Sequence, residues 1–136
     1  MDASITTYPL PKTMLYSIAG TMDTLLGSLE PPKTAFFGGY FKKEGQNSAI
    51  QGQLIDPHGQ ATIEGALHAD TLEFVKKYEN GPSVEAQIEY HFQKSTHGLW
   101  EGTFTFKQGD KNVRGNTTCQ ISFVQLPNIE ESSPNQ

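Results

Sequence analysis

Apolar and polar residues alternate with a period of two along most of this chain. The clearest example is the segment 83–93, in which the two kinds change places at every position from Val84 to Gln93. Side chains on a β-strand point alternately to opposite faces, so the pattern predicts strands with one apolar and one polar face. Eight segments are predicted as strands: 14–22, 34–42, 48–56, 60–68, 71–78, 83–93, 98–107 and 112–123.

Two of these segments leave an alternative open. Met14, Ile18 and Met22 also lie at helical spacing, so a short helix competes with a strand at the start of the chain. In the segment 34–42 both faces are apolar, and the sequence therefore does not decide which face is inside.

Short turns connect most of the predicted strands. Asp56-Pro57-His58-Gly59 is a strong turn signal, because proline presets one backbone angle and glycine accepts a positive one. Such turns join antiparallel neighbours, so the sheet is predicted to be a meander. An eight-stranded meander covers its own apolar face by closing on itself. The predicted fold is all-β, a single eight-stranded antiparallel meander barrel. A two-sheet sandwich is the alternative, but it usually needs longer crossovers than this sequence offers.

A length of 136 residues predicts one domain. The barrel is expected to span residues 14–124, after an irregular lead-in at 1–13. The segment 125–136 is polar and unpatterned, which predicts a disordered tail.

Glycine recurs in the middle of the predicted strands, on the face assigned as inner. Glycine weakens a flat strand, so its repeated placement indicates strong bending or room for an inserted aromatic ring. A structural role is favoured over lining a ligand cavity. The glycines concerned are Gly20, Gly39, Gly52, Gly65, Gly102 and Gly115.

Composition narrows the functional classes. The net charge is −5 and the basic residues are scattered, which argues against nucleic-acid binding. No apolar run approaches the ~20 residues of a membrane helix, and residues 1–12 lack the pattern of a secretory signal. The single cysteine, Cys119, fits a reducing compartment. A cytoplasmic location is therefore expected, with no membrane partner.

The pattern Tyr16-x-Ile18-x-Gly20 opens the meander, and Gly98-Leu99-Trp100-Glu101-Gly102 comes late in it. With these features, residues 14–123 resemble the calycin-type barrels, which include lipocalins, fatty-acid-binding proteins and avidins. Avidins use several tryptophans to hold biotin, whereas Trp100 is the only one here, so no family site residue is carried over. Avidin-like barrels associate through their outer faces, and the resemblance implies the same for this chain.

Lys76 is the most unusual residue of the predicted inner face. Strict alternation places its ammonium group between Phe74 and Tyr78, and an unpaired charge in a dry core is very unfavourable. Lys76 would then need a carboxylate, water or an anionic ligand. In the alternative, it lies at a strand end and extends to solvent, or a bulge turns it outward.

The inner aromatic residues could line a ligand pocket or fill a core. An eight-stranded barrel is just wide enough for either outcome, so both stay open. If the barrel holds a ligand, the predicted ligand-binding residues are Lys76, Phe74, Tyr78, Tyr90, Trp100 and Phe104.

No catalytic, metal or cofactor site is predicted. The four histidines, His58, His68, His91 and His97, lack the convergent spacing of metal ligands. Glu64, Glu89 and Glu101 fall on outer faces, where carboxylates are usually solvated. The motifs of nucleophile elbows, phosphate loops and dinucleotide sites are missing from the sequence.

The favoured function is a non-enzymatic barrel that binds a small hydrophobic or amphipathic molecule. If that molecule carries an acidic head group, Lys76 would neutralise it. The alternative is a filled barrel that serves as a structural or interaction module. Its outer apolar residues Phe36, Tyr40, Val75 and Leu99 would then pack against a partner or a second copy. An enzyme with an acid–base pair at the barrel mouth is the least favoured of the three.

Overall fold

The computed structural model describes residues 13–25, 33–44, 47–81, 86–108 and 110–124, and their regular secondary structure is entirely β. Eight strands follow one another along the chain: β1 (Thr13–Leu25), β2 (Lys33–Glu44), β3 (Ala49–Asp56), β4 (Gly59–His68), β5 (Thr71–Tyr78), β6 (Gln87–Lys94), β7 (Trp100–Gln108) and β8 (Lys111–Val124).

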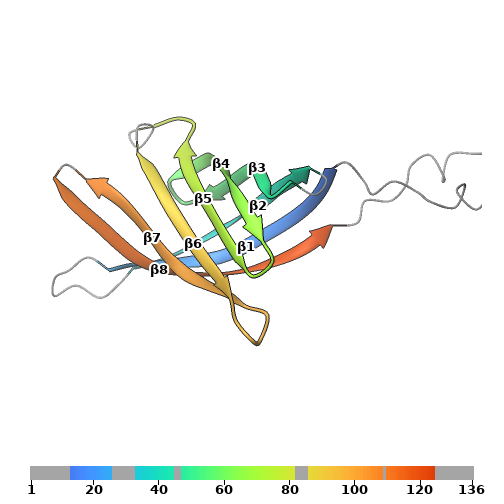
Figure 1. Ribbon diagram of the computed structural model, residues 1–136. Coiled ribbons are helices and arrows are strands. Elements are labelled where there is room, and N and C mark those ends of the chain that lie inside the picture. The colour runs from blue at the N-terminus through green and yellow to red at the C-terminus, as the bar shows by residue number, and fades with distance from the viewer. Residues whose placement is uncertain (1–12, 26–32, 45–46, 82–85, 109, 125–136) are drawn as a thin grey trace, which may run out of the picture.

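Each strand pairs antiparallel with the next, and β8 pairs with β1 to close a barrel (Figure 1). This order confirms the predicted meander and shows that the alternative of a two-sheet sandwich is wrong. Closure follows from the pattern, because a single sheet with one apolar face can bury that face and its edges only by curving onto itself.

Several predicted boundaries need correction. The helical alternative near Met14 is wrong, because a continuous strand runs over Thr13–Leu25 and starts one residue before the predicted barrel. Ala86 lies outside β6, which begins at Gln87, although the alternation had suggested an earlier start. Gly98 belongs to the turn before β7 and has a positive φ of 87°. The predicted lead-in and tail, at 1–12 and 125–136, lie outside the described residues.

The register of β2 decides the question that its sequence leaves open. Phe37 and Phe41 are buried inside the barrel, whereas Phe36 is 72% exposed and Tyr40 is 41% exposed on the outside. Pairing with β1 on one side and β3 on the other fixes this orientation, since Phe37 lies opposite Gly20 and Phe41 opposite Gly52. One apolar face of β2 therefore packs in the core, and the other lies on the outer surface of the barrel.

Inner glycines lie directly across from phenylalanines on neighbouring strands. The cross-strand pairs are Gly20 with Phe37, Gly52 with Phe41, Gly65 with Phe74, Gly102 with Phe92, and Gly115 with Phe104. A Cβ on Gly65 would overlap the main chain and side chain of Phe74, and the other four sites are similarly crowded. At Gly52, Gly65, Gly102 and Gly115 the added Cβ would meet the paired phenylalanine, which confirms the predicted room for an aromatic residue. At Gly20 it would meet Thr118 and Cys119 of β8 instead, and at Gly39 it would meet the backbone of Gln53 and Leu54.

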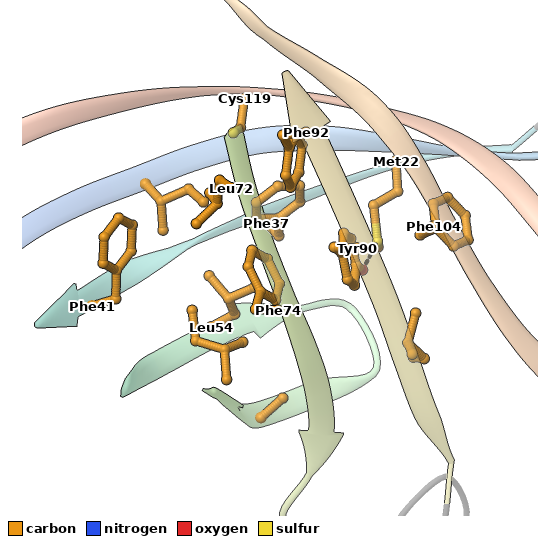
Figure 2. Packing of buried hydrophobic residues seen from close by; sticks show 14 of the residues in the cluster. Met22, Phe37, Phe41, Leu54, Leu72, Phe74, Tyr90, Phe92, Phe104 and Cys119 are labelled. Carbon is orange, nitrogen blue, oxygen red and sulfur yellow. Dashed lines mark hydrogen bonds between the residues drawn. The ribbon is translucent and has the colours of Figure 1, made fainter. Parts of the chain in front are cut away.

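Four rings, here called the aromatic ladder, fill the interior on the side of β5, β6 and β7. Phe74 stacks on Tyr90 with ring centroids 4.8 Å apart, and Tyr90 stacks on Phe104 at 5.7 Å (Figure 2). Phe106 continues the series beyond Phe104 at 6.5 Å. Offset stacking at these separations stabilises a core beyond its buried area. The described interior is therefore packed around these rings.

Replacing Gly102 by alanine is expected to destabilise the barrel by about 1–3 kcal/mol, since crowding of this kind forces backbone shifts. The new Cβ would overlap the carbonyl oxygen of His91 and lie 2.8 Å from the Cα of Phe92. Gly38→Ala is the matched control: a Cβ there meets only the carbonyl oxygen of Ile18, at 3.8 Å. The control should be neutral or stabilising by up to about 1 kcal/mol, because alanine restricts the unfolded chain. Urea unfolding of both variants measures the difference, and equal losses would contradict the role assigned to Gly102.

Candidate functional site

Lys76 extends into the barrel from the middle of β5. The strand keeps its alternation through this point, with Lys76 between Ile63 of β4 and Ile88 of β6, and the residue is 0% exposed. The structure thus decides the orientation that the sequence left open: the side chain points into the barrel. The alternative, in which the side chain extends to solvent or a bulge turns it outward, is wrong because β5 is regular and the ammonium group has a partner inside.

That partner is Asp56, the last residue of β3. Its Oδ2 accepts hydrogen bonds from Lys76 Nζ and from the Tyr78 hydroxyl, both at 2.6 Å. Its Oδ1 accepts the backbone N–H of His58 at 2.8 Å. Sequence reasoning placed Asp56 at the end of the strand 48–56 and in the turn that follows, and it missed this role. The signal was available, because Asp56 follows Leu54 by two residues and is therefore in phase with the inner face of β3.

Aromatic rings and a thioether surround the rest of the ammonium group. Lys76 Nζ lies 4.7 Å from the ring centroid of Tyr78 and 5.2 Å from that of Tyr90, within cation–π range. It also lies 3.9 Å from the sulfur of Met22, which accepts a hydrogen bond from the Tyr90 hydroxyl at 2.7 Å (Figure 2). These five residues, Met22, Asp56, Lys76, Tyr78 and Tyr90, form one buried polar network.

The network shifts the pKa of its members in ways that follow from burial and contact. Burial alone raises the pKa of the Asp56 carboxyl, but the bonds from Lys76 and Tyr78 and the charge of Lys76 lower it below its ordinary value. Burial lowers the pKa of Lys76, and the contact with Asp56 offsets this only in part. The lowered pKa of Asp56 favours the charged pair, whereas the lowered pKa of Lys76 opposes it. Three donors to one carboxylate favour the charged pair near neutral pH. Burial raises the pKa of both tyrosines, so both hydroxyls stay protonated.

The predicted ligand-binding residues divide into separate groups. Phe74, Tyr90 and Phe104 belong to the aromatic ladder, and Lys76 and Tyr78 belong to the polar network with Tyr90. Trp100 is 6% exposed at the far end of β7, where it lies opposite Cys119, and it is four residues from Phe104 along the strand. The structure thus brings five of the six residues into the ladder and the network, and Trp100 belongs to the same buried hydrophobic cluster without being a member of either. Their function in ligand binding stays a prediction.

A cleft opens where β7 separates from β6. The pairing of these two strands runs from Lys94 with Trp100 to Glu89 with Thr105 and then stops. The pairing of β7 with β8 continues for three more residues, to Gln108 with Lys111, and this hairpin diverges from β6 at its end (Figure 1). A cleft of about 720 Å³ lies between the separated edges. It is named the β6–β7 cleft below.

The cleft has an apolar floor and charged rims. Its lining includes the inward-facing residues Phe106 and Val113, and Phe106 stacks on Phe104 of the aromatic ladder. Lys107 and Arg114 line the rim on β7 and β8, and Glu89 lines it on β6. The remaining lining residues are Ala86, Gln87, Thr105 and Asn112. Sequence reasoning did not find this site, because alternation within each strand carries no information on where two strands part.

The histidines and glutamates keep the outer positions predicted for them. His68 and His91 lie on outer faces, His58 and His97 lie in turns, and all four are exposed. Within the described residues, His91 Nδ1 lies 3.3 Å from a carboxylate oxygen of Glu73, and His91 Nε2 lies 3.8 Å from one of Glu89. These exposed contacts are ion pairs only when the imidazole is protonated. No group of residues suited to hold a metal ion occurs in the described ranges. Cys119 is a buried free thiol, and burial raises its pKa to about 12.

Comparison with known proteins finds no family model that matches the chain and no significantly similar curated protein. The closed eight-stranded antiparallel barrel agrees with the calycin-type architecture that the sequence resembles. No helix in the described part of the chain is long and apolar enough to cross a membrane.

Replacing Lys76 by methionine is expected to lower the free energy of unfolding by about 3 kcal/mol, because it leaves the Asp56 carboxylate buried without its cation. The double variant Asp56→Asn/Lys76→Met removes both charges and keeps an oxygen that can accept from Tyr78. It should recover at least about half of the loss, since breaking a buried pair is worse than replacing it. Denaturant unfolding of both variants tests this, and a double variant less stable than the single one would contradict it.

The wild-type protein is expected to lose stability in acid partly through Asp56. The carboxyl has a lower pKa in the folded chain than its ordinary value of 3.8, so the unfolded chain takes up the proton first as the pH falls. The stabilisation is complete above the unfolded pKa and is lost as the pH falls through the folded one. Between about pH 5 and pH 2 the double variant should therefore lose less stability than the wild type. Parallel acid-dependent curves would show that Asp56 does not contribute.

Proposed function

We propose that this protein is a non-enzymatic binding protein that holds a small amphipathic anion in the β6–β7 cleft. The observation that carries the proposal is the cleft itself. Its volume of about 720 Å³ lies within the range of roughly 300–1,000 Å³ that small-molecule sites occupy. Such sites combine apolar walls with a few placed polar groups, and this cleft has both.

The apolar part of the ligand would lie on the floor of the cleft. Phe106 and Val113 supply the floor, and Phe106 is the outermost ring of the aromatic ladder. A chain or ring system placed there would extend the stacked series of Phe74, Tyr90 and Phe104 without disturbing it. Burying apolar ligand surface against these rings supplies the main part of the affinity.

The acidic group would bind at the rim formed by β7 and β8. Arg114 lies opposite Thr105, and Lys107 lies opposite Asn112, which makes the two cations diagonal neighbours at roughly 7–8 Å. Neither has an ion-pair partner among the residues that the structure describes. A guanidinium group with a nearby ammonium suits a carboxylate or phosphate group. Glu89 on the opposite rim would repel a second anion there and orient the ligand.

The packing of the interior favours this cleft over the middle of the barrel. Lys76 and Tyr90 are 0% exposed, and the charge of Lys76 is balanced by Asp56. A ligand bound among the originally predicted residues would have to displace stacked rings and break this pair. The binding function predicted from the sequence is thus retained, with its site moved to the edge of the aromatic ladder. The buried free thiol of Cys119 is compatible with a reducing, cytoplasmic setting.

A second candidate function is that of an interaction module with a filled barrel. The observation that favours it is the exposure of large apolar side chains on the outer surface, above all Phe36 at 72% and Ile55 at 61%. Val75 and Leu99, also predicted to contact a partner, are only partly exposed. The two functions use different surfaces and do not exclude each other.

Binding is tested with the fluorescent anion 8-anilinonaphthalene-1-sulfonate, displaced by dodecanoate or by dodecanol. The double variant Lys107→Gln/Arg114→Gln should weaken dodecanoate binding about tenfold or more, since charge-assisted hydrogen bonds are lost. Dodecanol binding should change little. Lys94→Gln, at the opposite end of β6, is the matched control and should leave both affinities unchanged.

Filling the cleft is the complementary test. Ala86→Trp should reduce the affinity for both displacing molecules, because the ring would occupy the space between the separated edges. Displacement that is not saturable in the wild-type protein would refute the binding function. Saturable displacement that Ala86→Trp does not alter would place the ligand elsewhere.

A further inference from the structure

The outer face of β2 carries an unusual row of residues, here called the β2 stripe: Phe36, Gly38 and Tyr40. The two aromatic side chains are 72% and 41% exposed, and Ile55 of β3, which pairs with Gly38, is 61% exposed. Phe36, Tyr40 and Ile55 surround the glycine. Exposed large apolar residues are normal when scattered, but a cluster of them indicates an interaction surface.

Gly38 is not required by the fold. A Cβ at Gly20, Gly39 or Gly52 would overlap the backbone of a neighbouring strand, whereas a Cβ at Gly38 would meet only the carbonyl oxygen of Ile18, at an ordinary 3.8 Å. Its backbone is also not in the left-handed region that favours glycine. Because glycine weakens a strand, its place between two exposed rings needs another reason. Because Gly38 has no side chain, it leaves a space between the rings of Phe36 and Tyr40, here called the notch, in which a ring from another molecule can lie.

The surroundings of the notch carry no charge. On β1 the outward neighbours are Ser17, Ala19 and Thr21, and on β3 Gln53 lies opposite Tyr40. Four exposed glutamates lie on the outer faces of β4 to β7, at Glu64, Glu73, Glu89 and Glu101, and Glu79 follows β5. Glu44, which is also exposed, ends β2 six residues from Gly38 and lies outside the notch. In a protein with a net charge of −5, an uncharged face is the part of the surface on which two copies meet with the least repulsion.

Opposite charges mark the two ends of the stripe. Thr34 and Lys42 are each four residues from Gly38, in opposite directions along β2. Asp23 pairs with Thr34 and accepts a hydrogen bond from its hydroxyl at 2.6 Å. The stripe therefore has Asp23 beside one end, Lys42 beside the other and the notch in the middle. Glu44 lies two residues beyond Lys42 at the end of β2, where it accepts a hydrogen bond from the Thr13 hydroxyl at 3.2 Å. Lys42 is exposed and has no ion-pair partner within the described ranges.

We propose that the β2 stripe is the interface of a symmetric dimer of this protein. The two-fold axis would lie between the two facing sheets, above Gly38 and perpendicular to β2. This axis places the two stripes face to face and antiparallel. Phe36 then faces the partner's Tyr40 across the notch, and Asp23 approaches the partner's Lys42. In a two-fold dimer each contact occurs once on either side of the axis. The same stripe on both protomers therefore forms the whole interface, because its two ends are complementary to each other.

The size of the patch suits this occupant. An aromatic side chain can bury about 150–250 Å², so the exposed parts of Phe36, Tyr40 and Ile55 provide a few hundred Å² of apolar centre. A stable interface buries about 800 Å² on each partner, with an apolar centre and a polar rim. The uncharged polar side chains of β1 and β3 around the stripe supply such a rim.

Sedimentation velocity of the purified full chain, from low micromolar to near-millimolar concentration, tests the proposal. The wild-type protein should show a concentration-dependent monomer–dimer equilibrium. Gly38→Gln should raise the dissociation constant of the dimer about tenfold or more, because it fills the notch at the centre of the interface. Thr103→Gln, on the outer face of β7, is the control and should not change it. Circular dichroism and thermal unfolding would verify that both variants keep the fold.

The charge pattern tests the antiparallel arrangement separately. Lys42→Glu and Asp23→Lys should each weaken the dimer, because each places like charges against one another. Combining the two in one chain should restore much of the lost affinity. A wild-type protein that remains monomeric throughout, or a dimer that Gly38→Gln does not weaken, would overturn the proposal. Failure of the combined variant to recover would overturn the antiparallel arrangement.

Discussion

The packing of phenylalanine rings against glycines on the next strand is the constraint on which this barrel depends. The interior holds five such pairs, and at four of them a Cβ on the glycine would overlap the paired phenylalanine. At the fifth, Gly20, it would overlap Thr118 and Cys119 of β8. Close approach allows strong strand curvature, and the rings fill the space that the curvature encloses. The result is a barrel with a packed centre. Among the described residues, the packing of the rings ends at Phe106, and the β6–β7 cleft lies beside it.

The buried polar network within the same core favours one alignment of the strands over others. Asp56, at the end of β3, reaches Lys76 and Tyr78 on β5 across the intervening β4. A buried ion pair contributes little to stability compared with apolar residues of the same volume, but breaking it is severe. Its effect is to distinguish one register from another: a slip of β5 by one residue would turn Lys76 to the solvent and leave the Asp56 carboxylate buried alone. The pair thus favours the observed alignment of three strands over its alternatives.

The two outer surfaces of interest lie on different strands of the meander. The β6–β7 cleft depends on β6, β7 and β8, and the β2 stripe depends on β2 with its neighbours β1 and β3 (Figure 1). Their chemistry differs accordingly. The cleft has apolar walls and two cations that have no ion-pair partner among the described residues, which is the basis for proposing an amphipathic anion there. The stripe has an uncharged aromatic centre with Asp23 and Lys42 beside its ends, which is the basis for proposing a protein partner. Association of two copies through β2 leaves the β6 and β7 edges of each barrel unoccupied.

The alternation of the sequence by itself determined the strands and the meander, and it marked Lys76 and the mid-strand glycines as unusual inner positions, because side-chain direction in a strand depends only on local backbone geometry. It did not decide which face of β2 is inside, since both faces are apolar and only pairing with Gly20 and Gly52 distinguishes them. The partner of Lys76 was likewise decided by the tertiary structure, because Asp56 is 20 residues away in the chain and meets it only through the register of three strands. The position of the cleft was also decided by the tertiary structure. The point at which β7 separates from β6 depends on how the two strands pair, and the alternation within either strand does not predict it.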